Sequence, residues 1–350
     1  MTLPPVPIRG VMTPIRRAYL IDHDSGTETE IGVDAAQVVI DRKSVARRIV
    51  DAHVYDADPR LLAAPHRLRL VSGYRVAGTD YTTNLAHVRI GRRSTGQRRG
   101  WSLTGCTSFE SIVAGARFSS PRTLAGGTSM LGHIVTLISE AVPWATIRVD
   151  TARDALVPPG GVTHERERWG AIAGEAESLA TALGVDVACD GSGTFVLRDR
   201  TTVDTWAIAD TDLLVDWREE TDPASVVNAW SCASDHPDVN PVWGEAVDTD
   251  PYSPSRVARW GEVRNFHVSP YYGEAWQCEQ AALSFLAGSR GQRADLDLTA
   301  VPNPWLDEWT AVAATRDGAT ETHELDRIVH GWRVDEPMTL TAASRLVSVQ

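Results

Sequence analysis

The sequence predicts an α+β protein that is mainly β, in which two barrel-like antiparallel β domains flank a small α+β insertion domain. Strand patterns, with alternating or β-branched residues, fill both ends of the chain. Apolar residues at helical spacing are concentrated between these ends. At 350 residues the chain also exceeds the usual size of a single hydrophobic core. The predicted domains are residues 1–125, 126–202 and 203–350.

The first predicted domain consists of strands and turns. Residues 18–24 and 27–33 flank a Ser-Gly turn as the two arms of a hairpin do. Residues 36–56 place β-branched residues around a charged middle, and residues 66–71 alternate apolar and polar side chains with a period of two. The polar, arginine-rich stretch between Ile90 and Trp101 is predicted to be an exposed loop.

The insertion domain begins with a predicted helix. Thr128 is the predicted N-cap, and apolar residues recur at helical spacing from Met130 to Ile138. Residues 145–149 follow as a short strand.

A second helix is the clearest element of the insertion. Apolar residues between Trp169 and Leu183 share one helical face, and Gly184 marks the end of the helix. Residues 185–199 then form a predicted hairpin around the turn at residues 190–193.

The last predicted domain returns to strands, with one helix. In that helix Ala275, Cys278, Ala282 and Phe285 share a face, and a Gly-Ser-Arg-Gly stretch from Gly288 stops it. The predicted strands are residues 205–209, 213–220, 226–234, 242–247, 263–268, 293–301, 308–314, 323–334 and 338–347.

A rigid corner interrupts these strands at a Pro-Asn-Pro sequence. Proline fixes φ and holds the preceding residue in extended geometry, so the apolar residues around the corner are aimed in fixed directions. Pro302, Pro304, Trp305 and Leu306 are therefore candidates for a subunit interface. The alternative is that these four residues cap the core of their own barrel.

The charge distribution is uneven. The net charge of −12 argues against a sequence-specific nucleic-acid binder, because phosphate contacts need clustered Lys or Arg. Residues 1–150 carry a net +6 and residues 151–350 a net −18; residues 201–250 hold one Arg and twelve carboxylates. The acidic half is either a solvated face or a surface that complements a basic neighbouring domain. Lys43 is the single lysine of the chain.

The sequence predicts no catalytic residue, no cofactor and no metal site, since each near-motif fails at one position. Residues 127–131 resemble a nucleophile elbow, but Leu131 replaces the second glycine. Residues 164–168 begin like a zinc-protease helix, but Arg168 replaces the second histidine. Residues 190–195 lack the third glycine of a dinucleotide fingerprint. The acidic loop from Asp248 lacks the glycine and the final glutamate of an EF-hand. This loop is therefore either a cation site of less regular geometry or a turn without a ligand. We therefore predict that the chain is not an enzyme.

The four cysteines are far apart and are predicted to be small apolar core residues of a reducing compartment. No secretion signal or membrane span is predicted, because no apolar run is long enough.

Several segments resemble, in order, the hub proteins of tailed-phage tails, a family of minor tail proteins common in phages of actinobacteria. These segments are an Asp-Pro and Ser-Pro loop (Asp250, Pro251, Ser253, Pro254), a Gly-Glu-Val strand ending at Pro270, an alanine-rich helix, and the Pro-Asn-Pro corner. Upstream, residues 105–138 and 168–198 resemble the segment leading into the helical insertion and the insertion itself. The resemblance spans roughly residues 30–345, with one departure: Glu308 and Trp309 stand where the family has a Gly-Asp pair.

The resemblance implies a structural virion protein located at the tail tip or baseplate and assembled in the host cytoplasm. Such hubs form a homotrimer ring that closes the distal end of the tail tube. The implied partners are further copies of the chain, a distal tail protein or tail tube protein, the tape measure protein, and tail fibre or tip proteins. The alternatives are a distal tail protein, a carbohydrate-binding tail-tip protein or a tail-associated cell-wall hydrolase. The twelve tryptophans are compatible with carbohydrate binding, because aromatic rings stack on sugars.

Overall fold

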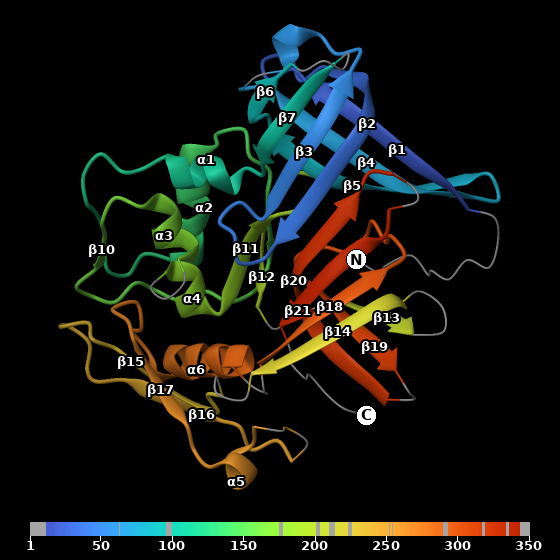
Figure 1. The fold of residues 1–350 in the computed structure, drawn as a ribbon. Coiled ribbons are helices and arrows are strands. Elements are labelled where there is room, and N and C mark those ends of the chain that lie inside the picture. The colour runs from blue at the N-terminus through green and yellow to red at the C-terminus, as the bar shows by residue number, and fades with distance from the viewer. Residues whose placement is uncertain are drawn as a thin grey trace.

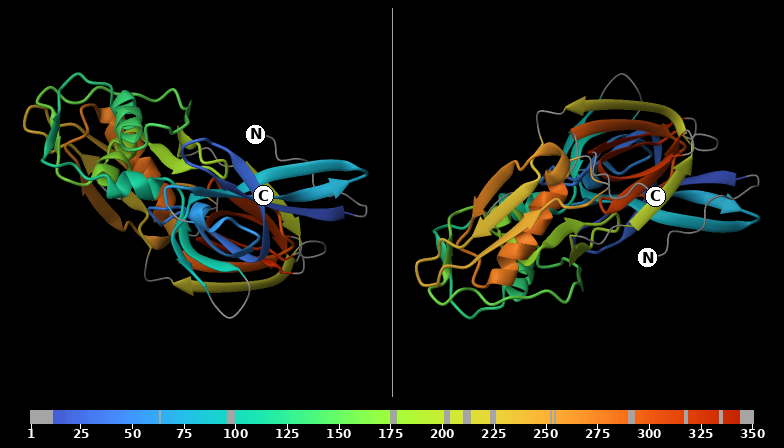
Figure 2. Two further views of the ribbon diagram at one scale, coloured as in Figure 1. Left: turned by 90° about the horizontal axis from the view of Figure 1, so that it is seen from above. Right: turned by 90° about the horizontal axis from the view of Figure 1, so that it is seen from below.

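The computed structural model describes residues 12–62, 64–95, 100–174, 178–200, 204–209, 214–222, 226–251, 253, 255–289, 293–316, 319–333 and 336–343. Within these residues the chain is mainly β, as predicted. Figures 1 and 2 show the strands of both chain ends together on one side of the molecule, and most helices in a lobe on the other side.

The N-terminal strands pair in an order that returns to its starting point. These strands are β1 (Met12–Ile21), β2 (Glu28–Asp41), β3 (Arg48–Tyr55), β4 (Arg67–Val76), β5 (Thr79–Arg89), β6 (Arg92–Ser94) and β7 (Trp101–Thr107). The order β1-β4-β5-β7-β3-β2 closes because β2 also pairs with β1. The predicted hairpin is confirmed, with Ala18 opposite Ile31. The predicted loop after Ile90 contains the exposed strand β6, and its residues 96–99 lie outside the described residues.

The C-terminal strands extend this sheet to 13 strands. They are β13 (Asp204–Ala209), β14 (Leu214–Asp222), β18 (Arg293–Ala300), β19 (Thr310–Arg316), β20 (Ala319–Gly331) and β21 (Met338–Ala343). Antiparallel pairing of β20 with β2, from Gln37 opposite Gly331 to Asp41 opposite Arg327, joins the two sets. One hydrophobic core lies within both sets; it includes Leu20, Ile40, Val50, Leu70, Leu298, Val312, Ile328 and Leu340.

The helical lobe begins at residue 110, before the predicted start of the insertion at residue 126. Its helices are α1 (Glu110–Gly115), α2 (Met130–Ala141), α3 (Arg168–Ala173) and α4 (Leu179–Leu183). Its strands are β8 (Arg122–Leu124), β9 (Ile147–Asp150), β10 (Val162–His164), β11 (Val185–Cys189) and β12 (Phe195–Asp199). The predicted hairpin at residues 185–199 is confirmed as β11 and β12.

Two details of the predicted helices are wrong. The N-cap of α2 is Ser129, not Thr128: its hydroxyl accepts a hydrogen bond from the Gly132 N–H. The second predicted helix is two short helices, because Gly174 has an extended backbone (ψ 158°) that ends α3. Ser178 then caps α4 by accepting from the Thr181 N–H, so a serine inside the apolar pattern starts a new helix.

Residues 226–289 pack on the helical lobe. They form β15 (Ala229–Ala233), β16 (Trp243–Val247), β17 (Arg264–Val268), α5 (Val257–Trp260) and the predicted long helix α6 (Ala275–Ser289). The second hydrophobic core contains Phe109, Ile134, Leu137, Leu183, Phe195, Cys232, Cys278, Ala282 and Leu286. This core therefore crosses the predicted domain boundary at residue 203.

Gly244 allows α6 to lie close to β16. A Cβ atom at Gly244 would lie 2.4 Å from the backbone nitrogen of Glu279. Gly244→Ala is therefore expected to cost about 1–3 kcal/mol of unfolding free energy, measured by urea denaturation. At Gly115 an added Cβ meets nothing within 4 Å, so Gly115→Ala is the control and should lose no stability. Equal denaturation midpoints for the two variants would contradict this account of the close approach.

Candidate functional site at the junction of three chain regions

The near-motifs found in the sequence have structural roles. The Ser129 hydroxyl caps α2 and donates to the Asp154 carboxylate at 2.6 Å. Residues 190–194 form the turn between β11 and β12, where the Asp190 carboxylate accepts from the Ser192 and Thr194 N–H groups. The buried Asp248 carboxylate accepts from the hydroxyl of Ser255. Among the described residues, no group of three or more His, Cys, Asp or Glu side chains is arranged to hold a metal ion.

The four cysteines are buried free thiols. Burial raises the pKa of Cys106 and Cys278 to about 11 and that of Cys232 to about 12. A nucleophilic cysteine needs a lowered pKa, so these thiols act as apolar packing groups. Within the described residues, no helix is both long enough and apolar enough to span a membrane.

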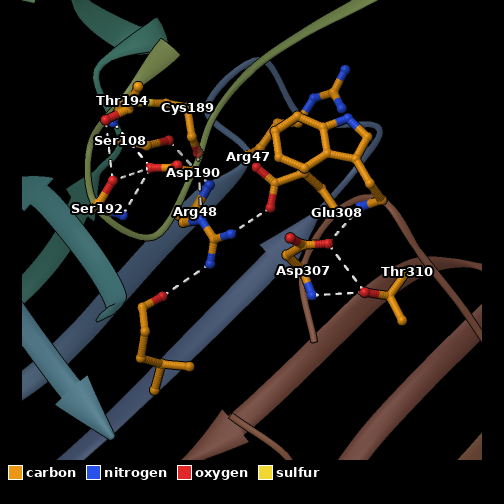
Figure 3. A network of polar contacts seen from close by, with 12 residues as sticks. Arg47, Arg48, Ser108, Cys189, Asp190, Ser192, Thr194, Asp307, Glu308 and Thr310 are labelled. Atoms are coloured by element: carbon orange, nitrogen blue, oxygen red, sulfur yellow. Dashed lines mark hydrogen bonds and ion pairs between the residues drawn. The ribbon is translucent and has the colours of Figure 1, made fainter. Parts of the chain in front are cut away.

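A cluster of buried charged residues lies at the junction between the strands and the insertion. We define the junction as Arg47, Arg48, Glu110, Asp186, Glu308 and Trp309, which come from all three predicted domains. Figure 3 shows part of it, with Arg48 reaching from the start of β3 toward Glu308.

The first ion pair of the junction joins Arg47 to Asp186. The guanidinium donates two parallel hydrogen bonds, of 2.7 and 2.8 Å, to the two carboxylate oxygens. The Trp309 indole N–H donates a third, at 2.9 Å, to the same carboxylate. Burial alone would favour the neutral acid, but the Arg47 charge holds the pKa of Asp186 well below its usual range. This is the bidentate geometry that makes Arg–carboxylate pairs strong and directional.

The second ion pair joins Arg48 to Glu308. Arg48 donates to one Glu308 oxygen and also to the Leu85 carbonyl oxygen at 2.9 Å. The other Glu308 oxygen is buried and accepts no hydrogen bond from the part of the chain that the structure describes. Burial, opposed by the Arg48 charge, raises the pKa of Glu308 to about 7.

Glu110 completes the junction from α1. One of its oxygens accepts from the Cys189 N–H at 2.7 Å, and the whole carboxyl group is buried. Burial raises the pKa of this carboxyl group. The junction has no exposed nucleophile, and its charges are used to join parts of the chain.

The turn of the insertion hairpin packs tightly on β5. A Cβ atom at Gly191 would lie 2.0 Å from the Asn84 carbonyl oxygen, so only glycine fits. The Ser192 carbonyl oxygen lies 2.9 Å from His87 Nδ1. Backbone approach and ion pairs thus hold the insertion on the strands.

Other cations of the β2–β3 turn pair with carboxylates late in the chain. Arg42 lies 2.6 Å from Glu324, and Lys43 lies 2.7 Å from Asp326. Within one chain, carboxylates of the acidic C-terminal part therefore neutralise part of the positive charge of the basic N-terminal part.

The four predicted interface residues lie beside the junction but differ in exposure. Leu306 is 1% exposed and belongs to the core of the strands, and Pro304 is buried. Pro302 and Trp305 are half-buried. The Tyr74 hydroxyl donates to the Pro302 carbonyl oxygen at 2.6 Å, and the Tyr74 and Trp305 rings lie 6.1 Å apart. The corner is thus anchored to β4, and of the four predicted interface residues Pro302 and Trp305 are partly accessible.

A cavity of about 360 Å³ opens between the corner and the insertion hairpin. Its lining includes Trp305, Leu306, Asp307, Asp190 and Asn84, so all three chain regions contribute.

Sequence reasoning did not identify the junction residues as a site. The available signal was the adjacent pair Arg47 and Arg48 next to β-branched residues, because neighbouring side chains of a strand point to opposite faces. Their partners are 139 and 260 positions away, and no local pattern reveals such pairs.

Comparison with known proteins places the fold. No family model and no curated protein sequence matches the chain. The tail protein from Neisseria meningitidis MC58 has a similar structure, with a TM-score of 0.61 and 15% identity, covering 94% of this chain and 96% of that one. Prophage tail protein gp18 from Listeria monocytogenes EGD-e has a TM-score of 0.61 and 11% identity, covering 95% of each chain. The 43 kDa tail protein of prophage MuSo2 from Shewanella oneidensis has a TM-score of 0.58 and 10% identity, covering 94% of this chain and 98% of that one. Over nearly its whole length, the chain therefore shares its fold with phage tail proteins.

Proposed function

We propose that this chain is a structural virion protein, a tail or baseplate hub whose ring closes the distal end of a phage tail tube. The observation that carries the proposal is the similarity to three tail proteins along 94–95% of the chain. Among the described residues, the absence of a metal-binding group is compatible with a role in assembly.

The junction fits a subunit whose domains must keep their relative positions within an assembly. A ring subunit that transmits contacts between a tube and a tip needs its domains fixed relative to one another. Bidentate Arg–carboxylate pairing and the hairpin packed on β5 supply such fixing, since both depend on fixed geometry. In this proposal the copies form a homotrimer located at the virion tail tip.

The proposed partners follow from that position. One side of the ring meets a distal tail protein or the tail tube protein, the tape measure protein ends at the ring, and fibre or tip proteins attach to the other side. Pro302 and Trp305, at the accessible part of the corner, are proposed contacts with a neighbouring subunit or ring.

The corner contact is tested by two neighbouring substitutions. Trp305→Ala should abolish ring formation while lowering stability by only about 1 kcal/mol, because Trp305 is half-buried and loses mainly its contact with Tyr74. Leu306→Ala, in the core, should cost about 2–5 kcal/mol. Ring formation is followed by analytical ultracentrifugation and stability by urea denaturation. If Trp305→Ala loses as much stability as Leu306→Ala, the corner is core packing and the contact is refuted.

The symmetry of the assembled particle tests the function itself. Class averages of the purified chain from electron microscopy should show threefold rings. Sixfold rings would instead favour a distal tail protein. A monomer that cleaves cell-wall glycan would favour a hydrolase.

A further inference from the structure

The cavity beside the Pro-Asn-Pro corner has one apolar wall. Its volume of about 360 Å³ lies within the usual range of small-molecule sites, about 300–1,000 Å³. The corner forms the apolar wall with Pro304, Trp305 and Leu306. Pro304 and Leu306 are buried, so the half-buried Trp305 provides the accessible apolar surface of these three residues. The Tyr74 ring lies 6.1 Å from the Trp305 ring, and the Tyr74 hydroxyl is bonded to the corner, so β4 holds this wall in place.

The turn that follows the corner forms a polar wall. Asp307 Oδ1 accepts hydrogen bonds from the Trp309 N–H at 3.0 Å and from the Thr310 hydroxyl at 3.1 Å. Both bonds use the same oxygen, so the second carboxylate oxygen of Asp307 can accept from a ligand. The two bonds also hold the carboxylate in one orientation, as is usual for Asp in turns. Figure 3 shows this turn on one side of Arg48.

The insertion hairpin and β5 form a second polar wall. Asn84 Oδ1 accepts from Arg69 at 3.2 Å, which leaves the amide N–H groups of Asn84 as donors. Arg148 adds a guanidinium that is 52% exposed. The Asp190 carboxylate accepts from backbone N–H groups of its own turn, and Gly191 packs against β5, so this wall is fixed. The cavity therefore combines an aromatic surface with hydrogen-bond donors and acceptors.

The charges of the lining favour an uncharged ligand. Three carboxylates line the cavity, those of Asp190, Asp204 and Asp307. An anion would be repelled by them, and the Arg48 side chain is only 3% exposed and already paired. A cation would compete with arginines that are already present. Arg148 lies 3.9 Å from Asp190, and Arg198 lies 3.6 Å from Asp204. A neutral molecule with many hydroxyl groups meets neither obstacle.

We propose that this cavity binds a neutral saccharide. A sugar ring has an apolar face of C–H groups and a rim of hydroxyl groups, each of which can both donate and accept. The C–H face packs on the Trp305 ring, because aromatic side chains combine a large apolar surface with a flat shape. The hydroxyl groups donate to Asp307 and accept from Asn84 and Arg148. The inference goes beyond the proposed function, since it concerns a ligand and not the assembly of copies.

Saturation-transfer NMR tests the proposal with a panel of neutral sugars: glucose, galactose, mannose and N-acetylglucosamine. At least one of them should give a signal that is strongest for the C–H protons of one ring face. Glucosamine, which carries a cation, and glucose 6-phosphate, which carries an anion, are the matched charged probes and should bind at least tenfold more weakly. Monomeric and assembled fractions are measured separately, and a signal from either counts as binding. Absence of binding to all four neutral sugars would overturn the proposal.

Variants locate the binding site. Trp305→Ala and Asp307→Asn should each raise the dissociation constant at least tenfold. Asparagine keeps one oxygen for the turn and replaces the other with a donor, so the fold is preserved. Trp305→Phe retains a ring and should retain most of the binding. Trp243→Ala is the control, because Trp243 is 64% exposed and does not line the cavity. Loss of binding in Trp243→Ala would place the sugar elsewhere and refute the assignment.

The outcomes separate this inference from the proposed function. Trp305 is also a proposed subunit contact, so Asp307→Asn distinguishes the two roles: it should lose sugar binding and still form rings. Rings of a native chain that binds no neutral sugar would overturn the inference and leave the hub proposal standing. Sugar binding by a chain that never forms rings would support the inference and contradict the hub. Equal affinity for N-acetylglucosamine and glucosamine would show that the ligand class is wrong.

Discussion

Asp186→Ala is expected to lower the free energy of unfolding by about 3–5 kcal/mol, because it leaves the Arg47 charge buried without its partner. The Arg47 and Asp186 side chains are 11% and 8% exposed, so the Arg47 charge is largely shielded from bulk water. The Trp309 N–H loses its acceptor in the same variant. Urea denaturation at pH 7 measures the loss.

Two further variants test whether the loss of stability comes from the unpaired Arg47 charge. Asp80→Ala removes an aspartate from an exposed pair with Arg75 and should change stability little, because solvent screens such pairs. Arg47→Ala combined with Asp186→Ala should be less damaging than the two single losses summed, because no unpaired charge remains. If the stability losses of the two single variants add up in the double variant, Arg47 and Asp186 are not coupled. The junction would then not hold the domains in place.

Acid should destabilise the protein through His164. Burial first, and then the neighbouring charges of His133 and Arg122, lower the pKa of His164 to about 4. His164 therefore stays neutral in the folded chain between pH 6.5 and 4, whereas the unfolded chain takes up a proton below about pH 6.5. The unfolded state binds more protons in this window, so folding stability is lost as the pH falls through it. The expected contribution of His164 is about 3 kcal/mol at pH 4.

His164→Phe isolates this contribution. Phenylalanine preserves a flat ring in the stack with Phe118, His133 and Tyr271 but cannot bind a proton. It should cost about 1 kcal/mol at pH 7, since His164 Nδ1 lies 3.0 Å from the Tyr271 hydroxyl. Denaturation curves collected from pH 7 to pH 4 should show a shallower fall for the variant than for the native chain. Parallel curves would mean that His164 does not cause the acid sensitivity.

Local patterns predicted most of the elements correctly. The turn residues 190–193 gave the hairpin at residues 185–199, and helical spacing with a following Gly-Ser-Arg-Gly stop gave α6. Both signals act over a few residues, because a turn is local and side-chain direction in a helix repeats every 3.6 positions. The same spacing misread the break at Gly174, since a helical pattern continues across two short helices whose apolar residues enter one core.

By itself, the sequence determined the β-rich composition, the helical middle, the rigid corner and the unequal charge of the two halves, because each follows from neighbouring residues or from composition. Only the tertiary structure decided that residues 226–289 join the core of the insertion, that Leu306 is buried while Trp305 is partly accessible, and that Arg47 and Arg48 meet Asp186 and Glu308. The physical reason is that burial and ion pairing depend on distance in space. A strand pattern states which side chains share a face, but not which distant segment covers that face.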